Sequence, residues 1–287
     1  MSATADLHSL DYATPLDPLT LRHIGLIAGE GRFPILLAQA ARDRGISVTA
    51  VGINGITSPE LADYVDTMRW VEFGQFNRLI QICHEHNIRQ AIMAGRVKHR
   101  SIFQISKMDG RGMKLLARSV SRKADDLLGA VTREFAIENI EMLDSTLLLR
   151  QCMPPSGLLT PNCPPTQEIL DDIEFGKPLA NAIAGHDIGQ TIVVKQGAVI
   201  AVEAMEGTNQ TILRAGEIAG EGCVVVKVAK PRQDRRFDVP VLGLTTVKKL
   251  IQARGRAIAF PGSQALFFEV EEAVALAESR GITLLAW

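Results

Sequence analysis

Charged side chains crowd one short stretch of the sequence, residues 227–243, which reads KVAKPRQDRRFDVPVLG. Its charged members are Lys227, Lys230, Arg232, Asp234, Arg235, Arg236 and Asp238. Pro231 and Pro240 bracket the cluster and disfavour helix in the residues before them, so extended chain with a turn is predicted. Alternate side chains of extended chain share a face, which would place both aspartates and Arg236 on an open side, with Phe237 and Val239 toward the core. Such a face suits binding of a phosphate group with a divalent cation, and the alternative is a surface network of ion pairs.

A second set of polar residues lies in the segment AVEAMEGTN at 201–209. Glu203 alternates with Val202 and Ala204, so its carboxylate can leave the apolar side of a strand. Glu206 and Thr208 stand where a strand is predicted to turn into a helix. The Thr208 hydroxyl and the free N–H groups after it can hold a phosphate oxygen or a metal-bound water, whereas simple N-capping by Thr208 is the alternative.

The first half opens with a glycine-rich turn. Residues 22–28 predict a buried strand, GEGRFP at 29–34 a turn, LLAQAARDRG a helix, and residues 46–53 a second strand. This order is a βαβ unit, which implies a parallel sheet. Gly29 and Gly31, beside Arg32, leave the backbone open to an anion at the helix start, although Pro34 occupies the third glycine position of a dinucleotide fingerprint. The alternative is a tight turn that needs glycine only for its geometry.

A basic loop, GRVKHRSIF, begins with Gly95 and Arg96 after a predicted strand at 89–95. Open α/β sheets bind ligands at the carboxyl ends of their strands, so this loop is a candidate binding loop, with a solvated loop as the alternative. Residues 110–141 predict mainly helix. Asp125 and Asp126 within that stretch suit helix capping better than metal binding.

The predicted fold class is α/β in two parts. Five prolines in residues 150–166 indicate a boundary between them. We expect a flexible extension at 1–20, a Rossmann-like nucleotide-binding domain with a parallel sheet at 21–152, and a catalytic mixed α/β domain at 153–287. The second part has an antiparallel component, because Gln196 and Gly197 join two β-rich runs in a predicted hairpin.

Composition excludes several classes of protein. The 287 residues carry a net charge of −1, with 46% hydrophobic and 22% charged residues, which predicts a folded soluble protein and disfavours a nucleic-acid binder. Four scattered cysteines form no metal or disulfide pattern, so a reducing, cytoplasmic location is expected. The N-terminus resembles no signal peptide, and no apolar run reaches the ~20 residues that span a bilayer.

Three segments taken together resemble one known family. They are GEGRFP near the N-terminus, DIGQTIVVKQGAVIAVEAMEGT in the middle, and KVAKPRQDRRFDVPVLGLTT. The ordered set resembles the LpxI-type UDP-2,3-diacylglucosamine pyrophosphatases of lipid A biosynthesis, from about Ile24 to the C-terminus. The resemblance implies two domains with a lipid-linked nucleotide sugar between them, Mg²⁺ or Mn²⁺ as cofactor, and hydrolysis to UMP and 2,3-diacylglucosamine 1-phosphate.

The resemblance also assigns roles to residues. The family's essential aspartate matches Asp238 in RFDVP, so we expect Asp238 to hold the cation or orient the attacking water. Asp234 is a second catalytic candidate, and Glu203 and Glu206 are further metal ligands. The substrate-binding candidates are Lys195, Thr208, Lys227, Lys230, Gln233 and Arg236 in the second half, with Gly29, Gly31, Arg32, Gly95 and Arg96 at the uridine-phosphate end.

Asn209 stands where the family usually has aspartate, in EGTN instead of EGTD. That difference keeps a non-catalytic nucleotide-lipid binder as one alternative, although an asparagine carbonyl can still coordinate a hard cation. A dinucleotide-dependent oxidoreductase is the other alternative, weakened because Asn54 ends the second strand where an acidic residue would bind ribose. An amphiphilic substrate implies peripheral contact with the inner membrane. The sequence leaves open whether the chain forms a homodimer.

Overall fold

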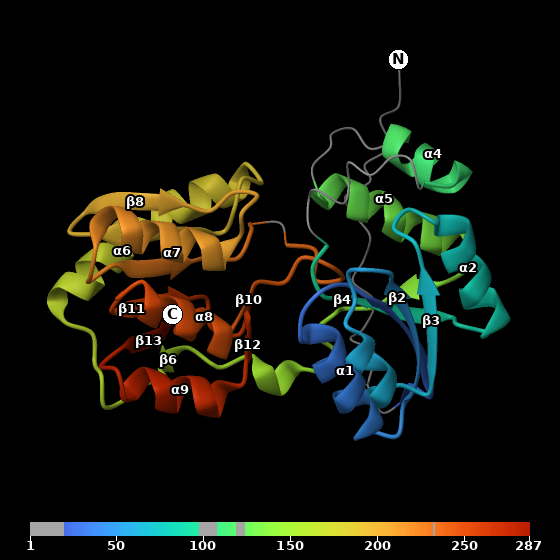
Figure 1. Ribbon diagram of the computed structural model, residues 1–287, viewed down its shortest axis with the longest axis horizontal. Coiled ribbons are helices and arrows are strands. Elements are labelled where there is room, and N and C mark those ends of the chain that lie inside the picture. The colour runs from blue at the N-terminus through green and yellow to red at the C-terminus, as the bar shows by residue number, and fades with distance from the viewer. Residues whose placement is uncertain (1–19, 98–107, 119–123, 232) are drawn as a thin grey trace, which may run out of the picture.

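A computed structural model describes residues 20–97, 108–118, 124–231 and 233–287 of the chain. Two α/β bodies lie side by side, each built around its own sheet, and extended segments connect them (Figure 1). The first sheet is parallel and the second is mixed, so the predicted fold class is confirmed. The expected extension at 1–20 lies outside the described residues except for Thr20, as do the side chains of Asp125 and Asp126.

The first sheet has the strand order β3-β2-β1-β4-β5, which matches the first five strands of the doubly wound dinucleotide-binding fold. Its strands are β1 (His23–Ala28), β2 (Ser47–Ile53), β3 (Thr67–Val71), β4 (Gln90–Ala94) and β5 (Glu141–Met142). Helix α1 (Phe33–Arg42) and the 3-10 helix η2 (Pro59–Tyr64) cover one face. Helices α2 (Phe76–Glu85), α4 (Gly110–Arg118) and α5 (Ala124–Ile137) cover the other.

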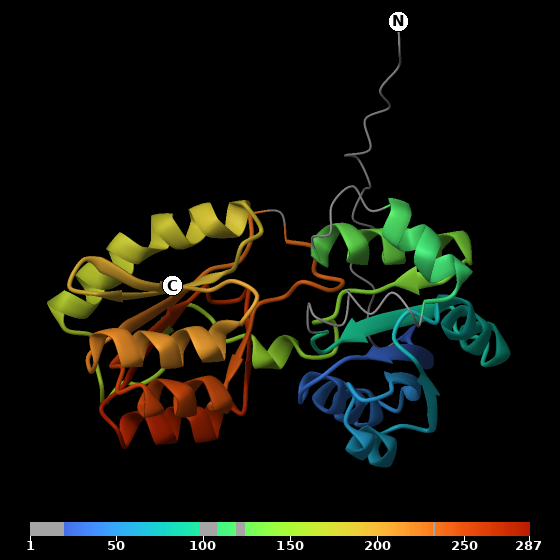
Figure 2. The same ribbon diagram turned by 45° about the horizontal axis from the view of Figure 1, so that its top comes forward.

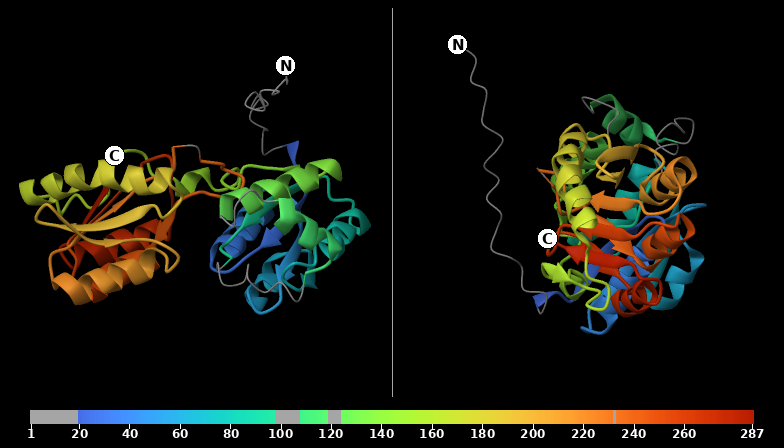
Figure 3. Two further views of the ribbon diagram at one scale, coloured as in Figure 1. Left: turned by 90° about the horizontal axis from the view of Figure 1, so that it is seen from above. Right: turned by 90° about the vertical axis from the view of Figure 1, so that its left-hand side faces the viewer.

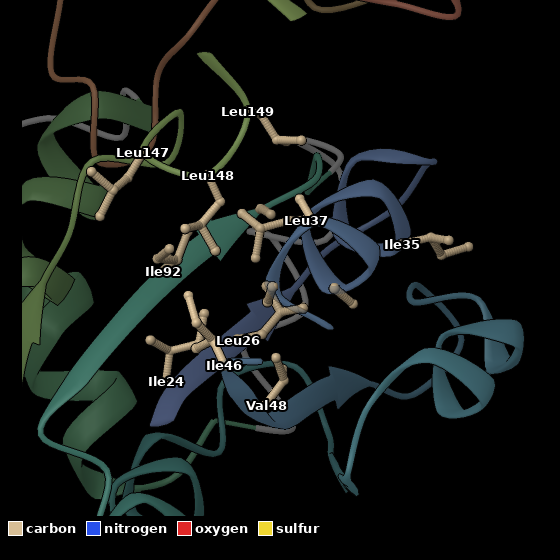
Figure 4. Close-up of a cluster of buried hydrophobic side chains, with 14 of the residues drawn as sticks. Ile24, Leu26, Ile35, Leu37, Ile46, Val48, Ile92, Leu147, Leu148 and Leu149 are labelled. Carbon is tan, nitrogen blue, oxygen red and sulfur yellow. The ribbon is translucent and has the colours of Figure 1, made fainter. Parts of the chain in front are cut away.

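The core under α1 explains why this part of the chain forms buried parallel strands. Figure 4 shows Leu26, Val48 and Ile92 of the strands among the side chains of this core, with Leu37 of α1. Strands covered on both faces need apolar residues at nearly every position, and β1 and β2 have them. Leu147, Leu148 and Leu149 close the core before the 3-10 helix η4 (Arg150–Cys152) leads toward the second body.

The second sheet has the order β6-β13-β11-β9-β7-β8. Its strands are β6 (Gly157–Leu158), β7 (Thr191–Lys195), β8 (Ala198–Val202), β9 (Val224–Lys227), β11 (Ala257–Phe260) and β13 (Thr283–Ala286). Strands β9, β11 and β13 are parallel, and β7 runs antiparallel to both β8 and β9. Gln196 and Gly197 both have positive φ between β7 and β8, so the predicted hairpin is confirmed.

Helices cover both faces of the second sheet, as Figures 2 and 3 show. Helix α6 (Gln167–Gly185) lies on one face. Helices α7 (Thr208–Ala219), α8 (Leu244–Gln252) and α9 (Val270–Glu278) lie on the other. None of the helices in the described part of the chain is long and apolar enough to cross a membrane.

Residues 228–231 and 233–240, between β9 and β10 (Val241–Gly243), form a crossing segment that reaches the first body (Figure 1). Strand β10 pairs with β12 (Leu266–Phe268). Arg235 fastens this crossing segment, because its Nε lies 2.9 Å from Asp144 Oδ2 and its Nη2 donates to Thr146 Oγ1 at 2.7 Å. Phe268 enters the first core, with its ring centroid 5.5 Å from that of Phe33. The two bodies therefore contact each other through the crossing segment and through Phe268 of β12.

Candidate functional site

Residues 234–238 of the charged stretch form the turn, whereas the alternation of side chains needed extended chain there. Asp238 N–H donates to the Asp234 carbonyl at 2.9 Å, and Phe237 N–H donates to the same oxygen at 3.2 Å. The expected alternation is therefore wrong: Phe237 is only partly buried, although Val239 does pack against the first core. Asp234 closes the turn with its carboxylate, which accepts from the Arg236 backbone N–H and guanidinium at 2.6–3.1 Å. Asp234 and Arg236, two of the predicted site residues, thus form an ion pair with each other within the turn.

Asp238 lies inside a compact polar cluster. Its Oδ2 is 2.9 Å from the ammonium of Lys230, and its Oδ1 accepts from Gln190 Nε2 at 3.2 Å. The same ammonium lies 2.5 Å from Asp187 Oδ1. The Lys230 and Asp238 side chains are only 11% and 19% exposed, so these charges interact with little screening by solvent. One ammonium therefore serves two carboxylates.

Unsatisfied polar atoms gather around Asp238. Of the buried side-chain polar atoms that have no hydrogen-bond partner among the described residues, Gln190 Oε1 and Gln233 Nε2 belong to this cluster, whereas Asp238 Oδ2 has its ion pair with Lys230. Gln233 reaches it through its other amide atom, which accepts from Lys230 N–H at 2.8 Å. Buried polar groups are normally hydrogen-bonded, so such a concentration indicates that something else, a substrate or water, completes the cluster.

Lys227 extends the cluster toward the start of α7. The ammonium of Lys227 is buried and donates to Thr208 Oγ1 at 2.9 Å and to Thr191 Oγ1 at 3.2 Å, with Glu203 Oε2 3.9 Å away. Thr208 in turn donates to Glu203 Oε1 at 2.9 Å. Burial acts to raise the pKa of Glu203, but the Lys227 charge and the hydrogen bonds of the two threonines outweigh it and hold that pKa below its usual value. Gln190 links the two groups of charges, because its backbone N–H donates to Glu203.

The N-terminus of α7 faces this group of polar residues. Thr208 is the first helical residue, and its hydroxyl donates to Glu203, so the alternative of N-capping by Thr208 is wrong. Gly207 holds the cap position at φ 82°, which favours glycine, and as a glycine it forms no side-chain cap hydrogen bond to the first N–H groups. A Cβ added to Gly207 would lie 2.8 Å from Arg96 Nη1, so a guanidinium from the first body lies over the helix start. Arg96, Lys227 and α7 together offer positive charge and N–H donors to an anion.

The two loops that carry the first body's predicted residues are packed against each other. Glu30 and Arg96 exchange backbone hydrogen bonds of 2.8 and 3.0 Å. A Cβ on Gly29 would lie 2.8 Å from the Arg96 carbonyl oxygen, and Gly95, at φ 92°, faces Gly29 equally closely. These two glycines are thus explained by the close approach of the backbones, and that contact holds Arg96 in place.

Other predicted residues lie apart from the cluster. Lys195 is at the far end of β7 from Thr191, the residue that pairs with Lys227, and its ammonium donates to the Ala219 carbonyl at 2.7 Å. Glu206 pairs with Arg214 at 2.7 Å. Burial raises the pKa of Glu206 and its hydrogen bonds more than offset this, so the net shift is downward. Arg32 lies 3.8–3.9 Å from Glu60 and Glu269, and Gly31 adopts φ 101° in open space.

A divalent cation fits this site only in part. Glu206 is turned away, and the described residues contain no group of three or more His, Cys, Asp or Glu side chains arranged to hold a metal. Asp238 and Asp187 do offer two carboxylates around one ammonium. Mg²⁺ is commonly held by one or two carboxylates together with substrate phosphates, so this pair fits a cation that arrives with a phosphorylated substrate.

Two members of the cluster, Asp187 and Gln190, were not predicted as site residues. Both lie in DIGQ, at the start of the middle segment that carries the family resemblance, but neither stands in a charge cluster that would single it out. Their proximity to Asp238 depends on the antiparallel pairing of β7 with β9, which brings the start of β7 to the end of β9.

Each of the two bodies matches the model of a known protein family. Residues 23–152 match the LpxI N-terminal domain family and residues 155–285 match the LpxI C-terminal domain family. UDP-2,3-diacylglucosamine pyrophosphatase LpxI of Caulobacter vibrioides is 30% identical over 276 residues, covering 92% of this chain and 97% of its own.

Two solved structures show more distant likeness. The biotin carboxylase domain of Hydrogenobacter thermophilus 2-oxoglutarate carboxylase is 10% identical, with a TM-score of 0.27 over 68% of this chain and 41% of that one. An N-terminal ketoreductase from a macrolactin assembly line has a TM-score of 0.26 at 10% identity, over 96% of this chain and 56% of that one. Overall likeness at this level does not bear on function.

Proposed function

This chain belongs to the LpxI family, and we propose that it hydrolyses the pyrophosphate bond of UDP-2,3-diacylglucosamine, giving UMP and 2,3-diacylglucosamine 1-phosphate for lipid A biosynthesis. The name of the Caulobacter vibrioides relative supports this reaction. The observation that carries the proposal is the gathering of Asp238, the buried Lys227, the partly buried Lys230 and the start of α7 at one place, with Arg96 reaching in from the other body.

The cationic groups suit a pyrophosphate. Lys227 Nζ, Arg96 and the first N–H groups of α7 would bind phosphoryl oxygens, and they are positioned before the substrate arrives. The charge that builds on those oxygens during hydrolysis is then met by donors that are already in position. This arrangement spans both bodies, so the substrate would lie across the crossing segment.

Asp238 is the proposed acceptor for the attacking water. The water oxygen forms a bond to one phosphorus while the bond from that phosphorus to the bridging oxygen breaks. One water proton passes to the Asp238 carboxylate, and the bridging oxygen leaves with the other phosphate. Gln190 and Lys230 fix the two oxygens of Asp238, so its orientation is set before the reaction.

Asp238 and Asp187 are the residues that would hold a Mg²⁺ or Mn²⁺ ion. Such an ion, when bound, neutralises phosphoryl charge and lowers the pKa of a coordinated water. The dependence of turnover on metal is part of this proposal.

Exposed apolar side chains beside the cluster support an amphiphilic substrate. Ile188 and Met205 are 50% and 62% exposed, and each lies within two residues of a cluster carboxylate. Gly189 lies against the Glu203 backbone, so the two loops that carry them are neighbours. We propose that this side of the molecule meets acyl chains or the membrane surface, which fits peripheral contact without a spanning helix.

The test is product analysis with purified protein and UDP-2,3-diacylglucosamine. Equal amounts of UMP and 2,3-diacylglucosamine 1-phosphate should form with Mg²⁺ or Mn²⁺ and cease with EDTA. Turnover that persists in EDTA would remove the metal from the proposal. Binding without products in saturating metal would favour the non-catalytic alternative, and Asn209→Asp would then show whether that residue is the cause.

A further inference from the structure

Glu206 and Arg214 form an ion pair that spans the loop between β8 and α7. Their charged atoms, Arg214 Nη2 and Glu206 Oε1, lie 2.7 Å apart. The same guanidinium nitrogen donates to the Val202 carbonyl, at the last residue of β8, at 2.9 Å. One arginine on the helix therefore holds both the end of the strand and the acid of the loop.

The Glu206 carboxylate also makes hydrogen bonds within the loop. Its Oε2 accepts from the Ala204 backbone N–H at 3.1 Å. The buried Thr211 hydroxyl lies 3.4 Å from Glu206 Oε1 and 3.1 Å from the Gly207 carbonyl, so it can donate to either. The carboxylate therefore links the loop before it to the first turn of the helix after it.

The outer part of the loop depends on this pair more than its first end does. At that end, the Glu203 backbone packs against Gly189. Farther out, Met205 is 62% exposed and therefore packs against little of the protein. The contacts of Glu206 and Arg214 are what connect this outer part to the strand and to the helix.

The same loop carries groups that are proposed to bind phosphate. Glu203 and Thr208 stand at its two ends, and the Thr208 hydroxyl donates to Glu203 Oε1 at 2.9 Å. The buried ammonium of Lys227 donates to Thr208 Oγ1 at 2.9 Å, so its position depends on the position of Thr208. A shift of the loop would therefore displace the Thr208 hydroxyl, the Lys227 ammonium and the start of α7 together.

We infer that Glu206 and Arg214 are positioning residues for the phosphate-binding groups at the start of α7. The pair fixes where β8 ends and where α7 begins, and so directs these donors toward one phosphoryl group. Neither residue touches a reacting atom. This role rests on the proposed pyrophosphate hydrolysis, in which the same donors bind the phosphoryl oxygens before and during the reaction.

Arg214→Met keeps the apolar part of the side chain and removes the guanidinium. A displacement of about 1 Å in a binding group can cost up to about 100-fold in activity, so kcat/KM for UDP-2,3-diacylglucosamine should fall about 10- to 100-fold. Most of the loss should appear in KM, because the displaced donors hold the bound substrate. Lys248→Met removes an exposed positive charge from α8, so it is the matched control and should retain the wild-type KM.

Stability separates positioning from a merely structural role. The Arg214 and Glu206 side chains are 44% and 31% exposed, and ion pairs this open to solvent contribute little to stability. The midpoint of urea unfolding should therefore stay close to that of the wild type in Arg214→Met while KM rises. A large fall in that midpoint would assign the pair a structural role and overturn the inference, as would a wild-type KM.

A double-mutant cycle tests whether the two residues act through one loop. Glu206→Gln keeps an acceptor for the Ala204 N–H but loses the charge, so KM should rise less than in Arg214→Met. In the double variant the two rises in KM should not multiply, because the same loop is already displaced. Rises that multiply would contradict a shared action.

Binding of inorganic pyrophosphate needs no turnover, so it separates this inference from the proposed function. Calorimetric titration should show affinity about tenfold weaker in Arg214→Met, and backbone amides 204–210 should exchange hydrogen faster. Unchanged binding and exchange would overturn the inference even in an active pyrophosphatase, as would a wild type that binds no pyrophosphate. Weaker binding by the variant of a protein that hydrolyses nothing would support the positioning role and refute the reaction.

Discussion

Lys227→Met should destabilise the protein strongly because it strands a buried carboxylate. The side chains of Lys227 and Glu203 are 6% and 12% exposed, and their charged atoms lie 3.9 Å apart. Coulomb attraction at that separation is about 4 kcal/mol in an effective dielectric of about 20. Removing one partner of a buried pair typically costs about 3–5 kcal/mol, so the free energy of unfolding should fall by that amount at pH 7.

Glu203→Gln should rescue much of that loss. With no charge at position 203, the missing ammonium no longer matters, so the double variant should be more stable than Lys227→Met alone. Urea unfolding followed by circular dichroism gives the free energy of unfolding for each protein and the coupling between the two changes. A loss below about 1 kcal/mol in Lys227→Met, or a double variant no better than the sum of the singles, would refute the reasoning.

The pH dependence of the free energy of unfolding tests the same pair independently. The folded-state pKa of Glu203 in the wild type lies below its unfolded-state value, because burial, which acts to raise it, is outweighed by the Lys227 charge and the threonine hydrogen bonds. The contribution of Glu203 to stability is therefore fully present above the unfolded-state pKa and is lost as the pH falls through the folded-state pKa. In Lys227→Met, burial without the ammonium should raise the pKa of Glu203 above its unfolded-state value. Protonation of Glu203 then removes the unpaired buried charge and restores part of the stability. The stability difference between the two proteins should therefore narrow as the pH is lowered from 7 toward 4.

Three further substitutions test the connection between the two bodies. Gly29→Ala places a methyl against the Arg96 backbone and should lower the free energy of unfolding in urea by about 1–3 kcal/mol. The control Gly185→Ala meets no neighbour within 4 Å and should leave the free energy of unfolding unchanged. Equal effects of the two substitutions would contradict the packing of the two loops. Arg235→Ala removes the hydrogen bonds to Asp144 and Thr146 from a side chain that is 41% exposed, so the free energy of unfolding should fall by about 1 kcal/mol. Proteolysis within 228–240 should become faster, and an unchanged cleavage rate would show that Arg235 does not hold the crossing segment against the first body. Arg96→Ala should raise KM about tenfold with little change in unfolding, because its guanidinium is 63% exposed, and an unchanged KM would exclude Arg96 from substrate binding.

Local patterns in the sequence predicted the elements well because each rule concerns neighbouring residues. The glycine turn at 29–34 between a strand and a helix, the hairpin at Gln196 and Gly197, and the buried strand before Lys227 all appear as expected. The charged stretch was harder, because Pro231 and Pro240 indicate only that the chain is not helical at the preceding residues. They do not show that Asp234 accepts from residues 236, 237 and 238 and closes a turn.

The composition of the site depended on long-range pairing. Lys195 has the right chemistry, but the antiparallel register of β7 and β9 puts Thr191 beside Lys227 and sends Lys195 to the opposite end. Glu206 is three residues from Glu203, yet Arg214 on α7 draws it away. Asp187 and Gln190 enter the site through the same register that excludes Lys195. No spacing within one segment carries that information.

The measurement that tests the central claim most directly is the rate of UMP release from UDP-2,3-diacylglucosamine by the wild type and by Asp238→Ala, with Mg²⁺ present. Wild-type protein should turn the substrate over, and the variant should retain the fold and bind the nucleotide lipid while losing turnover. Near-normal UMP release by Asp238→Ala would contradict the account, because the carboxylate that Lys230 and Gln190 hold in place would then have no part in the reaction.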